Sequence, residues 1–196
     1  MSAVRAPTQA SLRALARARR TSVPTMDTRV ALRSRRNVRQ YDGRPIPDTD
    51  LTRILEAARI TPSAGNRQYW DFVVVTERER LQRLATVWQG ARHVASSAAT
   101  IALVSPPTKD VRDREILQYD LGQATYGIML VAADLGIGAG HSAVGDQDAA
   151  REILGVPADH TVEWLVALGY PAGRPLSPVE SIDRRPFGEV VHREQF

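Results

Sequence analysis

One long helical pattern constrains this chain more than any other feature. Residues 112–135 are predicted to form a helix that is nearly apolar on all sides between Gly122 and Leu135. A helix without a polar face must be buried on most of its surface. A domain of this length can bury it centrally, and its small residues also suit contact with a second helix across a dimer. These small residues are Gly122, Ala124, Gly127, Ala132 and Ala133.

Shorter segments on both sides of this helix predict the rest of the fold. The predicted strands are 71–76, 99–104 and 162–168, and the predicted helices are 27–34, 49–60 (capped by Asp48), 77–87, 91–97 and 146–154. The glycines between 136 and 140 predict a tight bend, and the prolines after 171 predict an extended surface segment. Because helices separate the strands, we expect an α+β or α/β domain with a small central sheet.

The composition excludes several classes of function. The 196 residues are 43% hydrophobic and 24% charged, as in a soluble globular domain. No apolar run approaches the roughly 18 residues of a membrane span, so no membrane partner is expected. The absence of cysteine excludes disulfides and thiol nucleophiles, and it fits a reducing, cytoplasmic setting. No pair of histidines has metal-ligand spacing, so no metal site is expected.

The positive charge of the chain lies in its first residues. Residues 1–25 contain five Arg and no acidic residue, whereas the remainder carries 21 basic and 22 acidic residues. We interpret residues 1–26 as a disordered or wrongly annotated tail with Met26 as the start, and residues 27–196 as the domain. A targeting peptide and a segment that contacts nucleic acid remain alternatives. The tail has no aromatic residue to stack on bases, which disfavours nucleic acid.

Two arginine clusters stand near opposite ends of this near-neutral domain. Arg35, Arg36 and Arg39 fall within five residues, together with Asn37, and a second pair is Arg184 with Arg185. Arginine binds phosphate oxygens in pairs through its planar guanidinium group. Either cluster alone is compatible with a solvated surface turn. Together they favour a bound phosphate.

A loop of small and amide residues follows the second predicted helix. Ser63, Ala64 and Gly65 leave room for a flat ligand, and Asn66 and Gln68 each carry an amide that both donates and accepts hydrogen bonds. A heteroaromatic ring has such donors and acceptors along its edge. The chain shows no carboxylate pair or nucleophile motif for bond chemistry, so an enzyme of this sequence would depend on a bound cofactor.

These segments together resemble the FMN-dependent nitroreductase family. Residues 35–41 (RRNVRQY) are similar to its arginine-rich opening, and residues 62–70 (PSAGNRQYW) to its PSxxNxQPW loop. The helix that runs into residues 134–138 (DLGIG), the strand end at 168–171 (LGYP) and the segment 184–186 (RRP) also match, in the same order. The resemblance covers residues 27–196.

The resemblance implies an α+β fold of three layers, α/β/α, with a mainly antiparallel central sheet, a long central helix and FMN at a homodimer interface. It implies a ping-pong NAD(P)H oxidoreductase in which FMN passes electrons to a small acceptor such as a nitroaromatic or a quinone, with no catalytic side chain. A flavin protein for storage or sensing is the alternative.

The resemblance also assigns roles to residues. Arg35, Asn37 and Arg184 or Arg185 would hold the FMN phosphate, with Arg36 at the same turn, and Arg39 would lie toward the flavin N1 and O2 edge. The loop and the glycine-rich segment would contact the flavin through Pro62, Ser63, Ala64, Asn66, Gln68, Ser142, Ala143 and Val144. The chain departs from the family pattern at Asn37, Tyr69, His141 and the pair Ala143–Val144.

Overall fold

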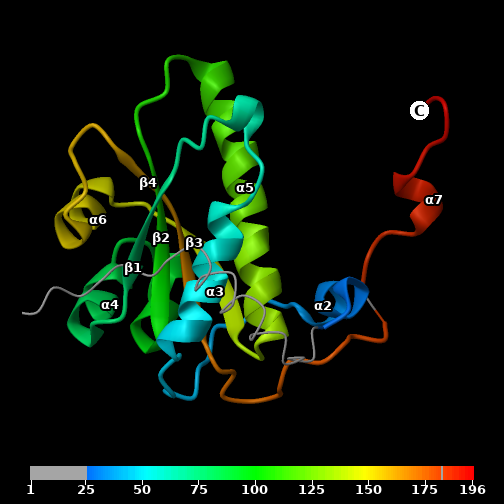
Figure 1. Cartoon of the computed structure of the whole chain (residues 1–196), viewed down its shortest axis with the longest axis horizontal. Helices are drawn as coiled ribbons and strands as arrows, with labels where there is room; N and C mark the ends of the chain where they lie inside the picture. The colour runs from blue at the N-terminus through cyan, green and yellow to red at the C-terminus, as the bar shows by residue number, and fades with distance from the viewer. Residues whose placement is uncertain (1–25, 182) are drawn as a thin grey trace, which may run out of the picture.

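A computed structural model describes residues 26–181 and 183–196 (Figure 1). Their backbone forms one four-stranded sheet in the order β1-β2-β4-β3, in which every pair of neighbours is antiparallel. The strands are β1 (Asp71–Val75), β2 (Ala99–Ser105), β3 (Gly138–Ala143) and β4 (Thr161–Gly169). The predicted α+β class with an antiparallel central sheet is confirmed.

Helices cover both faces of the sheet and complete three layers. On one face lie α3 (Asp48–Arg59) and α5 (Val111–Asp134), which share a core with Ile101, Leu103 and Val166 of the sheet. On the other face lie α4 (Arg78–Leu84), the 3₁₀ helix η2 (Gln89–Ser96) and α6 (Gln147–Leu154), whose core includes Ala102 and Leu165. The predicted α/β/α arrangement follows from these two cores.

The long helix α5 was predicted correctly to within one residue at each end. Asp110 caps its start by accepting a hydrogen bond from the backbone N–H of Asp113. After Asp134 the chain leaves the helix through Gly136, whose φ of 71° suits glycine. Eight of its residues are buried, including Leu121, Ala124 and Ile128, and all of them lie between Leu117 and Ala133.

Hydrogen bonds at a bulge in β4 join α5 to the sheet. Leu103 pairs with Trp164 and Val104 with Val162, so Glu163 is an extra residue in β4. Adjacent strand residues normally point to opposite faces, but this bulge lets Glu163 and Trp164 both bond to Gln118 of α5, at 2.9 and 3.1 Å. The buried Glu163 carboxylate also receives two hydrogen bonds from Arg114, at 2.7 and 2.8 Å. The position of α5 is therefore fixed by polar contacts as well as by its apolar face.

The predicted glycine bend at 136–140 is wrong in part, because Gly138 begins strand β3. The segment that follows α2 (Thr28–Ser34) runs beside this strand, and the glycines leave the space that it occupies. A Cβ on Gly140 would lie 2.3 Å from the carbonyl oxygen of Val38, and one on Gly138 would lie 2.6 Å from its side chain. Val38 also donates its backbone N–H to Ala139 at 2.9 Å.

Three smaller expectations need correction. Pro47, not Asp48, is the N-cap of α3, since Asp48 is already helical. The predicted helix 91–97 is the 3₁₀ helix η2. The predicted extended segment at the C-terminus contains a short helix, α7 (Phe187–Val190).

The C-terminal segment leaves the body of the molecule. After β4 the chain passes along α2, where Arg33 donates hydrogen bonds to the carbonyl oxygens of Val179 and Glu180. Beyond this point α7 and the last residues extend away from the sheet and its helices (Figure 1). We call residues 183–196 the C-terminal arm. Among the described residues, no helix has the length and apolar character needed to cross a membrane. The predicted tail lies outside the described residues, except for Met26.

Candidate functional site

The first arginine cluster and the C-terminal arm meet at one hollow of about 540 Å³. Arg35, Arg36 and Asn37 line it from the end of α2, and Arg184 lines it from the arm. These residues are about 150 positions apart in the chain, and the contacts of Arg33 with residues 179 and 180 bring them together. Among the described residues that line it, the only acidic one is Asp183. The hollow is therefore strongly positive.

Arg35 is held in place by an aromatic ring. Its guanidinium carbon lies 5.3 Å from the centre of the Tyr126 ring of α5, within the range of a cation–π contact. Tyr126 also lines the hollow. Arg185, by contrast, does not line it. Arg185 Nη2 donates a 2.9 Å hydrogen bond to the carbonyl oxygen of Glu189, within the arm itself. Of the two arginines predicted at this end, Arg184 is the one placed beside Arg35.

Three buried side-chain polar atoms of the described residues have no hydrogen-bond partner: Ser34 Oγ, Arg35 Nε and His141 Nδ1. Buried polar atoms are nearly always paired, so unpaired ones indicate where a group from outside the chain can bind. Two of the three belong to adjacent residues at the end of α2. The third belongs to β3, and its residue feels the charges of Arg39 and Arg35. The three orphaned atoms thus point to one region of the molecule.

The surroundings disfavour protonation of both histidines near this region. Burial, and after it the positive charges of Arg39 and Arg35, lower the pKa of His141 below its ordinary value. Burial also lowers the pKa of His93, although its ring nitrogens lie 3.1 Å from Gly90 O and 3.2 Å from Gly140 O, contacts that favour protonation. Because protonation of both imidazoles is disfavoured, the positive charge of the site comes mainly from the guanidinium groups.

The predicted flavin-binding loop has a strained backbone. Three of its residues have left-handed φ values: Gly65 at 59°, Asn66 at 54° and Gln68 at 52°. Such values are uncommon for residues other than glycine and often occur at functional sites. The amide of Gln68 donates to Asn66 Oδ1 at 3.2 Å, and Ser63 Oγ accepts the backbone N–H of Gln68 at 3.0 Å. Both amide side chains are exposed, so they remain available to a ligand.

Two carboxylates of α5 hold this loop. The buried Asp120 accepts the backbone N–H of Ala64 at 3.1 Å, and Asp113 forms an ion pair with Arg67. Pro62, Ser63 and Ala64 line a hollow of about 370 Å³ against α5. This hollow includes Gln123 but none of the predicted phosphate-binding arginines. Gln123 and Tyr126 are three residues apart on the same helix face, so the loop hollow and the arginine hollow follow one another along α5.

The remaining predicted residues lie at the end of β3. Ser142 is buried, Ala143 is half-buried, and Val144 packs on the core that contains Val87 and Leu154. A Cβ on Gly90 would lie 3.7 Å from Ser142 Oγ, so η2 passes close to the strand. Within one chain, the structure brings Arg35, Arg36, Asn37 and Arg184 to one hollow. Residues 62–64 of the loop line a separate hollow, and residues 142–144 line none of the hollows described here.

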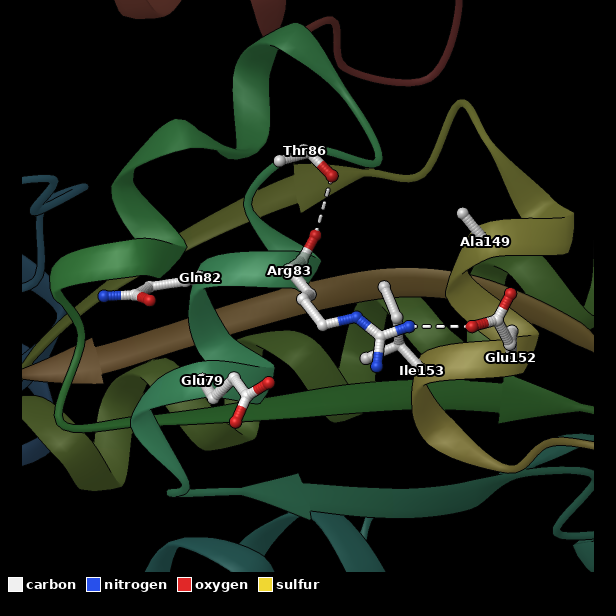
Figure 2. A pocket seen from close by; sticks show the side chains of 7 residues that line it. All are labelled: Glu79, Gln82, Arg83, Thr86, Ala149, Glu152 and Ile153. Carbon is white, nitrogen blue, oxygen red and sulfur yellow. Dashed lines mark hydrogen bonds and ion pairs between the residues drawn. The ribbon is translucent and has the colours of Figure 1, made fainter.

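A further groove lies between α4 and α6, away from all of these residues. Figure 2 shows its lining, in which Arg83 pairs with Glu152 at 2.8 Å and Thr86 bonds to the backbone of Arg83. Of its charged groups, Arg83 and Glu152 thus pair with each other. None of the predicted site residues lines it.

The donor groups of the arginine hollow fit the phosphate of FMN. Guanidinium groups and the Asn37 amide donate hydrogen bonds, which phosphate oxygens accept. Among the described residues, the buried Arg35 Nε has no hydrogen-bond partner.

Comparison with known proteins identifies the family of this chain. The model of the nitroreductase family matches residues 32–93 and 85–170. The chain belongs to the nitroreductase family. A protein from Archaeoglobus fulgidus, provisionally named NADH dehydrogenase/NAD(P)H nitroreductase, is 34% identical over 83% of this chain and 95% of its own length. An NADPH-flavin oxidoreductase from Vibrio harveyi is 27% identical over 88% of this chain and 74% of its own length.

Solved structures of nitroreductase family proteins share the fold. An FMN-dependent nitroreductase from Clostridium difficile R20291 superposes with a TM-score of 0.73 at 25% identity, covering 85% of this chain and 98% of that one. A nitroreductase family protein from Clostridium difficile 630 gives a TM-score of 0.76 at 24% identity, covering 87% and 100%. The predicted family resemblance and fold are confirmed.

Several residues of this nitroreductase family member were not found by sequence reasoning. Tyr126, Asp120 and Arg33 support the site, but their partners lie 91, 56 and 146 positions away in the chain. No local pattern marks such pairs. The one available signal was Asp120 itself, an acidic residue in the predicted apolar helix just before its fully apolar stretch.

Proposed function

We propose that the protein is an FMN-dependent NAD(P)H oxidoreductase that acts as a homodimer. The observation that carries this proposal is the hollow where Arg35, Arg36 and Arg184 converge with a buried, unpaired donor atom. In a member of the nitroreductase family, a positive hollow of this kind suits the phosphate of FMN. The names of its relatives, which include an FMN-dependent nitroreductase and an NADPH-flavin oxidoreductase, support the choice of cofactor.

Each group of residues has a binding task in this proposal. Arg35, Arg36, Asn37 and Arg184 hold the phosphate, and Arg39 places a positive charge near the flavin edge. When bound, FMN supplies the redox chemistry by accepting a hydride from NAD(P)H and then passing two electrons to a small electron-poor acceptor. The side chains of the loop orient the cofactor. The chain itself supplies no nucleophile.

The surface of the single chain supports a second copy as partner. The C-terminal arm exposes Phe187 and Val190, with 73% and 50% of their surface accessible, although it extends away from its own domain. On α5, Tyr119 and Tyr126 are also exposed, at 73% and 38%. Both features leave apolar surface in water unless another subunit covers it. A second chain would also bring a second copy of the loop and of the arginine hollow to the interface.

The test is anaerobic reduction of purified protein. We expect a yellow protein that contains about one FMN per chain and loses its flavin absorbance when NADH or NADPH is added without oxygen. Addition of a quinone or nitroaromatic should restore the colour. A protein that binds FMN but is not bleached by either nucleotide would contradict the enzymatic role and favour storage or sensing. A protein that binds no FMN would contradict the proposal altogether.

A further inference from the structure

Four arginines surround two adjoining hollows that the FMN phosphate would not occupy. One hollow of about 400 Å³ is lined by Arg36, Arg39 and Arg174, and the other, of about 500 Å³, is lined by Arg39 and Arg92. Arg39 borders both, so Arg92 and Arg174 approach it from different sides. Arg174 follows β4 and Arg92 belongs to η2. We call Arg36, Arg39, Arg92 and Arg174 the basic patch.

The basic patch has no acidic partner among the described residues. Within the part of the chain that the structure describes, no Asp or Glu lines either hollow. In the described part of the chain, none of the four guanidinium groups forms an ion pair, whereas arginines elsewhere, such as Arg59 and Arg83, do. Unpaired arginines grouped around a concave surface attract anions with several charges, because their fields add.

The positive charge of the basic patch affects the pKa of two neighbouring histidines. After burial, the charge of Arg39 is among the causes that lower the pKa of both His93 and His141. The backbone also holds part of the patch together, because Arg36 Nη2 donates to the carbonyl oxygen of Arg174. This contact links the segment beside β3 to the segment after β4. The two arginines are therefore placed side by side rather than scattered over the surface.

We propose that the basic patch, through Arg92 and Arg174, binds the phosphate groups of the nicotinamide nucleotide and selects NADPH over NADH. This inference rests on the proposed function, since the donor must lie next to the bound flavin. Arg36 lines both the FMN phosphate hollow and the patch, so the two sites are contiguous. NADPH carries an extra phosphate monoester with about −1.5 to −2 charge at neutral pH. A planar guanidinium group donates two parallel hydrogen bonds to such a phosphate, and NADH lacks this phosphate.

The experiment compares two variants with the same loss of charge. Arg92→Ala with Arg174→Ala removes half of the patch without touching the residues assigned to FMN. Arg53→Ala with Arg80→Ala removes two exposed arginines of α3 and α4, each in a local ion pair with a residue three positions away. Stopped-flow bleaching of the FMN-loaded protein gives the second-order rate constants for NADPH and NADH. Calorimetric titration with adenosine 2′,5′-bisphosphate measures binding directly and does not depend on turnover.

The unchanged protein should react at least about tenfold faster with NADPH than with NADH at low salt, and the patch variant should lose this preference. The patch variant should also bind adenosine 2′,5′-bisphosphate at least about tenfold more weakly, while the control variant keeps both properties. Equal rates with the two nucleotides in the unchanged protein would overturn the proposal, as would a preference that survives in the patch variant.

One result would reassign the patch to a different anion. If the patch variant were bleached normally but reoxidised slowly by an anionic quinone, the patch would serve the acceptor, and the NADPH proposal would be wrong. Failure of the protein to bind FMN would count against the proposed function instead. In that case the bisphosphate titration still decides the patch: binding that requires Arg92 and Arg174 supports it, and absence of binding refutes it.

Discussion

Replacing Arg114 with Met should destabilise the protein through the charge that it leaves behind. Glu163 has only 3% of its side chain exposed and accepts hydrogen bonds from Arg114, Ser105 and Gln118. Removing one partner of a buried ion pair costs about 3–5 kcal/mol. Because Arg114 is 42% exposed and two neutral donors remain, we expect the lower value, about 3 kcal/mol. For a chain of this size that corresponds to a fall in Tm of about 6–12 °C.

The assay is thermal unfolding followed by circular dichroism, with a matched control. Arg59→Met removes an arginine whose pair with Glu56 is exposed on both sides, and it should change the Tm much less than Arg114→Met. Adding Glu163→Gln to Arg114→Met should recover at least about 1 kcal/mol, because the buried group is then neutral. Equal Tm values for Arg114→Met and Arg59→Met, or a further loss in the double variant, would refute the reasoning.

Three other predictions concern the loop, the exposed face of α5 and pH. Asp120→Ala should weaken FMN binding at least about tenfold by removing the acceptor of the Ala64 backbone N–H, whereas Glu115→Ala in the same hollow should not; fluorescence titration of the apoprotein checks this. Gly122→Ala has open space around it, so it should stabilise a monomer by about 1 kcal/mol but weaken a dimer that packs on this face; sedimentation at several concentrations separates the two results. The folded protein lowers the pKa of His141, so the unfolded chain binds more protons at low pH. The free energy of unfolding should therefore fall as pH drops below about 6.5, and it should fall less in His141→Phe. Urea unfolding at pH 5 and pH 8 measures the difference.

The sequence predicted those parts of the fold that depend on local patterns. The all-round apolar stretch of α5 and the apolar runs of β1, β2 and β4 led to their correct positions within one or two residues. Strand β3 was missed because Gly138 and Gly140 have low strand propensity and favour turns. They are in a strand because β3 pairs with β4, and they are glycines because Val38, about 100 residues earlier, leaves no room for a Cβ. Only the folded chain shows that contact.

The same distinction applies to the candidate site. The arginines and the loop were identified from their residue types, but sequence reasoning could not choose between Arg184 and Arg185. The choice depends on the path of the arm beyond residues 179 and 180, which Arg33 binds. It also depends on the carbonyl oxygen of Glu189, which accepts a hydrogen bond from Arg185. The supporting role of Asp120 depends on the backbone conformation of the loop, which adjacent residue types do not specify.

The most direct test of the account is the flavin content of two variants. Arg35→Ala with Arg184→Ala removes two arginines from the hollow and should yield a folded, colourless protein that does not take up added FMN. Arg35→Ala with Arg185→Ala removes the same charge but leaves Arg184 in the hollow, and it should retain more FMN by absorbance. Full FMN occupancy in the first variant, or identical loss in both, would contradict the claim that guanidinium groups from the two ends of the chain hold one phosphate.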